Sequence, residues 1–264
     1  MVDKTTIPWA DYTWNPWQGC KKISPGCKYC YMYRDMDRYK LDGNIIRRSA
    51  DATFNKPLKM DKYKTVFTCS WSDFFLEQAD AMRDDAWEII RKTPHLVYLI
   101  LTKRPENINA RLPKFWKELN NVYLGVSIEN SDQLPRWESL TRSVGTEKTF
   151  ISFEPLLGPI TLKDRFTLKN LPSWVIIGGE SGNDHGKHVF RPCQTAWILP
   201  VMSYFQFFNV PVFIKQMGSE IAKLQHYNDR KGENPSEWHE AYRKREFPEF
   251  DYKDSNGTQS DLFG

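Results

Sequence analysis

The chain has 264 residues, and its 37 Lys and Arg against 33 Asp and Glu give a formal net charge of +4. With 40% hydrophobic and 27% charged residues, it has the composition of a globular protein, which excludes a disordered chain. The longest apolar run, residues 96–101, is far shorter than the ~20 residues of a membrane span, and the N-terminus has no signal-peptide pattern. We therefore expect a cytoplasmic protein that does not associate with membranes.

Short apolar runs alternate with amphipathic segments along the chain. The runs predict strands at residues 12–15, 65–70, 96–102, 122–128, 149–153, 174–177 and 210–215. The segments between them predict helices at residues 79–92, 105–119, 132–143 and 195–208. Strands and helices that alternate in this way form βαβ units around a parallel sheet. The predicted fold class is therefore α/β, with the sheet curled into an open or closed barrel.

Polar and ionisable residues follow nearly every predicted strand. In a barrel of this kind, functional residues lie at the carboxyl ends of the strands. We therefore predict one site at that end, lined by Ser70, Asp73, Lys103, Ser127, Glu154, Glu180 and Lys215. The barrel is expected to span residues 1–227. Residues 228–264 are more polar and are expected to form an extension that ends in a flexible tail.

Three of the five cysteines, Cys20, Cys27 and Cys30, lie within eleven residues in a Gly- and Pro-containing loop. The odd number of cysteines argues against a disulfide framework. The sequence assigns no role to Cys193. A structural zinc site normally takes four protein ligands, and no fourth Cys or His stands at a conventional spacing. A cubane iron–sulfur cluster with three Cys ligands leaves one iron open. The spacing favours the iron–sulfur cluster, with zinc or unliganded thiols as the alternatives.

The residues around these cysteines resemble a known family. Trp14-Asn15-Pro16-Trp17, Ser24-Pro25-Gly26-Cys27 and Gly178-Gly179-Glu180-Ser181-Gly182 are similar to motifs of the phage-type Gp37/Gp68 proteins, the DUF5131 family. This family is a branch of the radical S-adenosylmethionine (SAM) superfamily. The first gap of six residues between cysteines departs from the usual superfamily spacing of three, so the loop is expected to bulge.

The resemblance implies a partial (β/α)6-type TIM barrel with a [4Fe-4S] cluster on Cys20, Cys27 and Cys30. It implies that SAM binds the open iron and is cleaved by an electron from the cluster to a 5′-deoxyadenosyl radical, which abstracts hydrogen from a substrate. The cofactor carries the chemistry while the protein orients it. An electron donor such as flavodoxin or ferredoxin is implied as a partner.

A further similarity, to the spore photoproduct lyases, assigns roles to the strand-end residues. It implies that Lys103 and Ser127 bind the SAM carboxylate and that Ser70 and Asp73 bind its polar end. Lys103 is otherwise a solvated strand-end lysine. Tyr31, directly after the last cysteine, is expected to pack near the adenine or simply within the loop.

Cys69 stands where the lyases carry a cysteine that donates hydrogen to a substrate radical. The same residue is otherwise a small buried hydrophobe. Glu154, Glu180 and Lys215 are expected to face the substrate, with Lys215 paired to either carboxylate. A purely structural ion pair is the alternative for Glu180.

The chain ends in Gln259, Leu262 and Phe263, a pattern similar to the peptide with which bacterial DNA enzymes dock on the sliding clamp. A disordered end is the alternative. Together these features predict a radical SAM enzyme acting on a nucleobase or nucleic acid, for DNA repair or modification. The alternatives are a radical SAM enzyme acting on a small metabolite or peptide, and a non-catalytic zinc or iron–sulfur module that binds nucleic acid.

Overall fold

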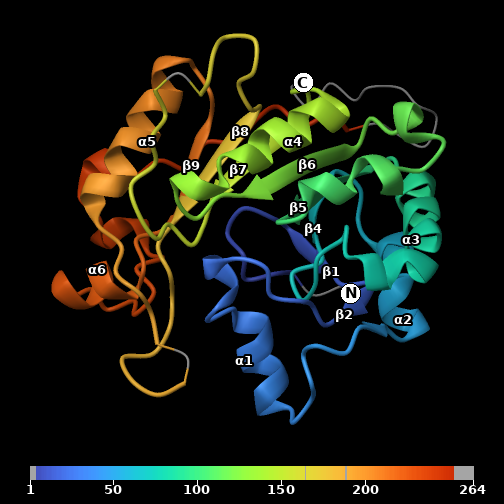
Figure 1. The fold of residues 1–264 in the computed structure, drawn as a ribbon, viewed down its shortest axis with the longest axis horizontal. Coiled ribbons are helices and arrows are strands. Elements are labelled where there is room, and N and C mark those ends of the chain that lie inside the picture. Colours follow the sequence, from blue (N-terminus) through green and yellow to red (C-terminus); the bar gives the residue numbers. More distant parts are fainter. Residues whose placement is uncertain (1–3, 164, 188, 253–264) are drawn as a thin grey trace.

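A seven-stranded parallel sheet forms the centre of the molecule in the computed structural model, which describes residues 4–163, 165–187 and 189–252. Its strands are paired in the order β1 (Tyr12–Trp14), β4 (Lys64–Thr68), β5 (Leu96–Thr102), β6 (Val122–Ser127), β7 (Thr149–Phe153), β8 (Trp174–Gly178) and β9 (Val212–Gln216). The sheet curls into a half-barrel with β1 and β9 at its edges (Figure 1). The predicted α/β barrel fold is thus confirmed as a half-barrel.

The α-helices are α1 (Tyr31–Arg38), α2 (Asp51–Phe54), α3 (Asp80–Lys92), α4 (Pro135–Val144), α5 (Thr195–Phe207) and α6 (Ser219–Leu224). Helices α3, α4 and α5 pack along the outer side of the sheet, whereas α1 borders the cavity at the carboxyl ends of the strands (Figure 1). A small antiparallel pair joins β2 (Trp17–Gln18) to β3 (Arg47–Arg48). Short 3₁₀ turns cover Pro25–Cys27, Lys56–Lys59, Glu77–Ala79, Ser131–Gln133, Pro235–Glu237 and Glu240–Tyr242. None of the helices in the described ranges is long and apolar enough to span a bilayer.

The helix predicted over residues 105–119 is wrong. The segment forms three separate 3₁₀ turns, Pro105–Asn107, Asn109–Arg111 and Trp116–Glu118. Leu112 is extended, with φ −71° and ψ 143°, because the following Pro113 disfavours the α conformation in the residue before it.

Alternate residues of the strands face opposite sides of the sheet. One side packs against the helices in the main core. The other side, near the amino ends of the strands, holds a second apolar cluster, here called the floor cluster: Trp9, Phe67, Val97, Leu99, Tyr123, Phe150, Trp174, Ile176 and Phe213. The floor cluster closes the amino end of the half-barrel, so the carboxyl end is left for a site.

The described part of the C-terminal extension packs against the edge of the sheet. Ile214 of β9 donates its backbone N–H to the carbonyl of Lys244 at 2.7 Å, and Trp238 is buried in the main core. Phe250 packs on Tyr123 of the floor cluster, with ring centroids 5.2 Å apart. The extension therefore contributes to both cores, while the predicted clamp-binding residues, 259–263, lie outside the described residues.

Candidate active site

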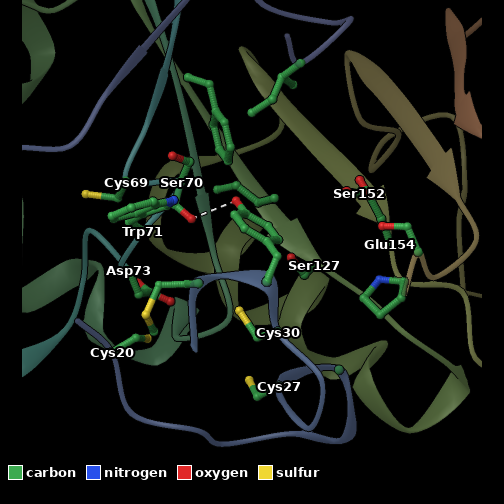
Figure 2. Close-up of a pocket in the computed structure, with 18 of the residues that line it drawn as sticks. Cys20, Cys27, Cys30, Cys69, Ser70, Trp71, Asp73, Ser127, Ser152 and Glu154 are labelled. Carbon is green, nitrogen blue, oxygen red and sulfur yellow. Dashed lines mark hydrogen bonds between the residues drawn. The ribbon is translucent and has the colours of Figure 1, made fainter. Parts of the chain in front are cut away.

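A cavity of about 580 Å³ lies at the carboxyl ends of the strands. Its wall combines the cysteine loop with strand-end side chains, and Figure 2 shows part of it. All the predicted site residues line it: Cys20, Cys27, Cys30, Tyr31, Cys69, Ser70, Asp73, Lys103, Ser127, Glu154, Glu180 and Lys215. Because the carboxyl ends of parallel strands meet at one edge of the sheet, residues far apart in the sequence share this cavity.

The three cysteines enter the cavity from one loop that runs from β2 to α1. Cys27 ends a 3₁₀ turn and Cys30 is the residue before α1. Gly19 turns the chain into the loop with φ +91°, and a Cβ there would lie 2.3 Å from the carbonyl oxygen of Ile45. All three thiols are free of disulfides.

The donor set suits a group larger than a single ion. A structural zinc site takes four protein ligands, whereas three thiols reach the cavity from this loop. A cubane takes one sulfur at each of three irons, so its ligands stand further apart. In Figure 2 the labelled sulfurs of Cys27 and Cys30 lie at the same side of the cavity. Three free thiols that line one cavity match the number of ligands that such a cluster takes.

Side chains from two strand ends and from the segment between β8 and α5 hold the cysteine loop in place. The Ser24 hydroxyl donates to the Glu129 carboxylate at 2.7 Å. The Arg104 guanidinium donates to the carbonyl of Lys21 at 2.6 Å, and that of Arg191 to the carbonyl of Pro25 at 2.8 Å. The loop is thereby fixed to the ends of β5 and β6 and to the segment between β8 and α5.

Glu129 is the most deeply buried of these anchors, with no exposed surface. It accepts from Arg136 of α4 at 2.8 Å, and the Lys103 ammonium lies 3.9 Å from it. A Cβ on Gly26 would lie 2.3 Å from its carboxylate oxygen, so the loop and the carboxylate are in close contact. The sequence assigned no role to Glu129, although its place directly after a predicted strand put it among the polar residues at the strand ends.

The surroundings of the three thiols shift their pKa values in different directions. Burial raises the pKa of the Cys27 thiol, but the nearby Lys103 ammonium and backbone N–H groups outweigh it, so this pKa lies below its ordinary value. At Cys30 burial prevails and the pKa is raised. At Cys20 burial, helped by the Asp73 charge, raises the pKa to about 12. The Lys103 ammonium thus acts on the charges of Cys27 and Cys30, and the Arg104 guanidinium acts on that of Cys20.

Of the residues predicted to bind SAM, Ser70 and Asp73 already have protein partners. The Ser70 hydroxyl bonds to the Asn15 amide at 3.0 Å, and the Tyr31 hydroxyl donates to the Ser70 carbonyl at 2.7 Å, the dashed line of Figure 2. Asp73 accepts from the Thr102 hydroxyl at 2.7 Å and from the Lys103 backbone N–H at 3.0 Å. Asp73 thus fixes the position of the Lys103 backbone, from which the Lys103 side chain projects.

The Cys69 thiol lies in the main core cluster and is 3% exposed. In Figure 2 its sulfur points away from those of Cys27 and Cys30. Burial raises its pKa well above the ordinary value for a thiol. This packing matches the reading of Cys69 as a small buried hydrophobe, and its role as a hydrogen donor stays a prediction. Cys193 is buried in the same core.

The predicted substrate residues form two separate ion pairs. Lys215 pairs with Glu154 across the inner face of the half-barrel. Glu180 pairs instead with Arg191, which donates to it from its backbone N–H at 2.9 Å and from its guanidinium at 2.8 Å. Arg191 also donates to the carbonyl of Pro25 in the cysteine loop. The Glu180–Arg191 pair therefore supports the loop, and Glu180 lines the cavity as well.

Comparison with known proteins gives a family and no activity. Residues 4–246 match the family described as "Protein of unknown function (DUF5131)". No curated protein matches the chain. Among solved structures, a mutant of spore photoproduct lyase with one cysteine replaced by serine is similar, with 16% identity and a TM-score of 0.47 over 67% of this chain and 58% of that chain. Spore photoproduct lyase complexed with dinucleoside spore photoproduct has 15% identity and a TM-score of 0.46 over the same shares. The chain spans less than two thirds of the length of these proteins.

Proposed function

The chain belongs to the DUF5131 family, and we propose that it is a radical SAM enzyme whose [4Fe-4S] cluster binds on Cys20, Cys27 and Cys30. The observation that carries the proposal is that three free thiols and Lys103 line one cavity. The cluster would supply one electron for the reductive cleavage of bound SAM, delivered by a donor such as flavodoxin or ferredoxin. The narrower kinship with phage Gp37/Gp68 proteins is part of the same proposal.

The side chains of the protein bind SAM and orient it. Lys103 and Ser127 are assigned to the SAM carboxylate, because an ammonium and a hydroxyl that line the same cavity suit a carboxylate. Ser70 and Tyr31 support the polar end and the ring of the ligand. Asp73 acts through the backbone of Lys103, which it holds by the bond described above.

The proposed substrate is a nucleobase or a nucleic acid, in DNA repair or modification. The mild net positive charge of +4 is compatible with such a partner, and the motif after β4 resembles that of the spore photoproduct lyases. A small metabolite or peptide is the competing substrate. Binding of short DNA at several salt concentrations separates the two, because phosphate contacts give a steep dependence on salt.

Anaerobic reconstitution tests the cofactor assignment. The protein is loaded with iron and sulfide, reduced in the presence of SAM, and assayed for 5′-deoxyadenosine. We expect about four irons per chain and deoxyadenosine from the wild type, and neither from a chain with Cys20, Cys27 and Cys30 changed to Ala. Cys193→Ala, which alters a cysteine in the main core, is the matched control and is expected to behave as the wild type.

Two results would contradict the proposal. Zinc bound in place of iron would favour a binding module without chemistry, as would a cluster that never cleaves SAM. Loss of iron in the Cys193→Ala control equal to that in the triple variant would show that the loop is not the ligand set.

A further inference from the structure

The loop that carries the three cysteines has a second, solvent-exposed side. The cysteines line the cavity. Four other residues of the loop are exposed and do not line the cavity, and we call them the outer loop face: Lys22, Ile23, Pro25 and Lys28. In Figure 2 the sulfurs of Cys27 and Cys30 point into the cavity, and the backbone of the loop passes on their other side. A cluster on these thiols is therefore separated from solvent by the loop alone.

The outer loop face is positively charged. Residues 12–34 contain four basic residues and no acidic one. Lys22 and Lys28 form no ion pair with an acidic side chain in the part of the chain that the structure describes. The carboxylate of Glu129, which contacts the loop, is fully buried and paired with Arg136. Both ammonium charges thus remain available to an acidic partner.

The loop itself holds the two lysines in place. The Lys22 ammonium donates to the Lys28 carbonyl at 3.1 Å and lies over the Tyr33 ring, 4.5 Å from its centroid. The Lys28 ammonium lies over the Tyr29 ring at 5.1 Å. Ile23, which is 47% exposed, lies between the two lysines in the sequence and adds an apolar contact. Because the charges are already positioned, little side-chain freedom is lost when a partner binds.

The position of the outer loop face suits a partner that delivers electrons. The cavity side of the loop is assigned to SAM and the substrate, so an electron has to reach the cluster from the other side. Electron transfer becomes slower as the distance between the redox centres grows, and here one loop separates the thiols from solvent. Electron-transfer proteins form small interfaces, so a face of two lysines and one exposed isoleucine is large enough to guide such an encounter.

We propose that the outer loop face is the docking surface of an acidic one-electron donor protein. Carboxylates of the donor pair with Lys22 and Lys28, and an apolar residue among them contacts Ile23. One electron passes from the reduced donor to the oxidised cluster. The donor is oxidised by this one electron, and no bond is formed or broken. The inference rests on the proposed function for the cluster, and it adds the surface on which the donor binds and the sign of the donor's charge.

Binding of a flavodoxin of net negative charge to the iron-loaded full chain, measured by titration calorimetry, tests the proposal. We expect the double variant Lys22→Glu/Lys28→Glu to bind about tenfold more weakly than the wild type. Binding by the wild type should weaken as the salt concentration rises. The matched control is Lys59→Glu/Lys62→Glu, which reverses two exposed charges just before β4, at the amino end of the sheet. This control should bind flavodoxin as the wild type does.

Deoxyadenosine formation with two electron sources separates docking from catalysis. Dithionite is a small reductant that needs no docking surface, so with dithionite Lys22→Glu/Lys28→Glu should form deoxyadenosine as fast as the wild type. With reduced flavodoxin as the electron source, the same variant should be about tenfold slower, in line with its weaker binding. Equal losses with both reductants, or equal rates of variant and wild type with flavodoxin, would overturn the proposal.

Lys28→Glu alone guards against damage to the loop by the double change, because the Lys28 ammonium contacts only the Tyr29 ring among the described residues. If the double variant retains less iron than the wild type, the single variant decides. Weaker flavodoxin binding at full iron content supports the proposal. Unchanged binding, or loss of iron in the single variant as well, would overturn it.

Short duplex DNA is the competing probe. If Lys22→Glu/Lys28→Glu loses binding to DNA and keeps binding to flavodoxin, the face binds nucleic acid and the proposal is wrong. The proposed function fails separately. A wild type that flavodoxin reduces through these lysines, but that never cleaves SAM, would leave the docking surface standing and remove the radical chemistry. A wild type that cleaves SAM with dithionite but does not bind flavodoxin would remove the docking surface alone.

Discussion

Glu129 is the residue on which the cysteine loop, β6 and α4 meet. Its carboxylate is fully buried and is paired with Arg136, whose side chain is 13% exposed. Removing one partner of a buried ion pair leaves the other charge without compensation. We expect Glu129→Gln to lower the free energy of unfolding by about 3 kcal/mol, measured by urea denaturation.

The control for Glu129→Gln is a second ion pair that also involves a residue of α4. Glu138 of α4 pairs with Arg165 at 3.1 Å, with both side chains about half exposed (49% and 50%). Exposed pairs contribute little, so Glu138→Gln should cost less than about 1 kcal/mol. Equal losses in the two variants would contradict the anchoring role of Glu129.

Gly26 tests whether close contact with Glu129 positions the cysteines. A Cβ at this position would meet a carboxylate that Arg136 and Ser24 already hold, so the loop has to shift. We expect Gly26→Ala to lose most of the iron that the wild type retains after reconstitution and gel filtration. Gly158→Ala is the control, because its Cβ would meet only Asn130 Cβ at an ordinary 3.6 Å. Full iron retention in Gly26→Ala would show that the contact is unimportant.

At the scale of elements, strand positions were predictable because buried parallel strands are continuous apolar runs. The predictions at residues 96–102 and 149–153 coincide with β5 and β7. The prediction at residues 65–70 runs past the end of β4, because Cys69 has φ +64° and leaves the strand geometry. That turn depends on contacts with β1, such as the bond from Cys69 N–H to the Trp14 carbonyl at 2.8 Å, which no local pattern reveals.

The start of α3 is held by Asp80, which bonds to Arg111 at 2.8 Å and pairs with the buried Arg83. Burial raises the pKa of Asp80, but the bonds to the two guanidinium groups outweigh it, so the pKa lies below its ordinary value. The pairs therefore stabilise the fold at neutral pH, and this contribution is lost as the pH falls through the lowered pKa.

We expect Asp80→Asn to cost about 1 kcal/mol at pH 7, since the half-exposed carboxylate is partly screened by solvent. The difference from the wild type should shrink as the pH falls below about 4. Asp85→Asn, on the exposed side of the same helix, should show neither effect. Thermal unfolding across this range of pH measures both, and a difference that does not change with pH would contradict the assignment.

At the scale of the whole molecule, aromatic residues from both ends of the chain close the amino end of the half-barrel. Trp174 contacts Trp9 at 6.1 Å, Phe247 at 5.6 Å and Phe250 at 6.0 Å between ring centroids. A chain ending at residue 246 loses Phe247, Phe250 and Tyr252 and exposes the floor cluster. Because burial of one large apolar side chain contributes ~1.5–3 kcal/mol, we expect this truncation to lose about 3 kcal/mol of stability, measured by urea denaturation. A chain ending at residue 252 keeps these contacts and is the control, and equal stability of the two would contradict the role of the extension.

The site was predictable in outline because a parallel sheet brings its strand ends together. The sequence indicated Lys103, Ser127 and the three loop cysteines as neighbours. It did not indicate how Glu129 holds the cysteine loop, because the contacts of this carboxylate with Ser24 and Arg136 depend on how distant parts of the chain fold together. It also did not indicate that Arg191, and not Lys215, pairs with Glu180, since long-range pairing depends on how the loops fold back.

The central claim is that the three-cysteine loop holds a [4Fe-4S] cluster with one iron open to SAM. Electron paramagnetic resonance of the reduced, iron-loaded protein, recorded with and without SAM, tests it most directly. We predict a cluster signal that changes when SAM is added, and a much weaker change in Lys103→Met, which lacks the ammonium assigned to the SAM carboxylate. A cluster signal that SAM does not alter, or no cluster signal at all from protein carrying Cys20, Cys27 and Cys30, would contradict the account.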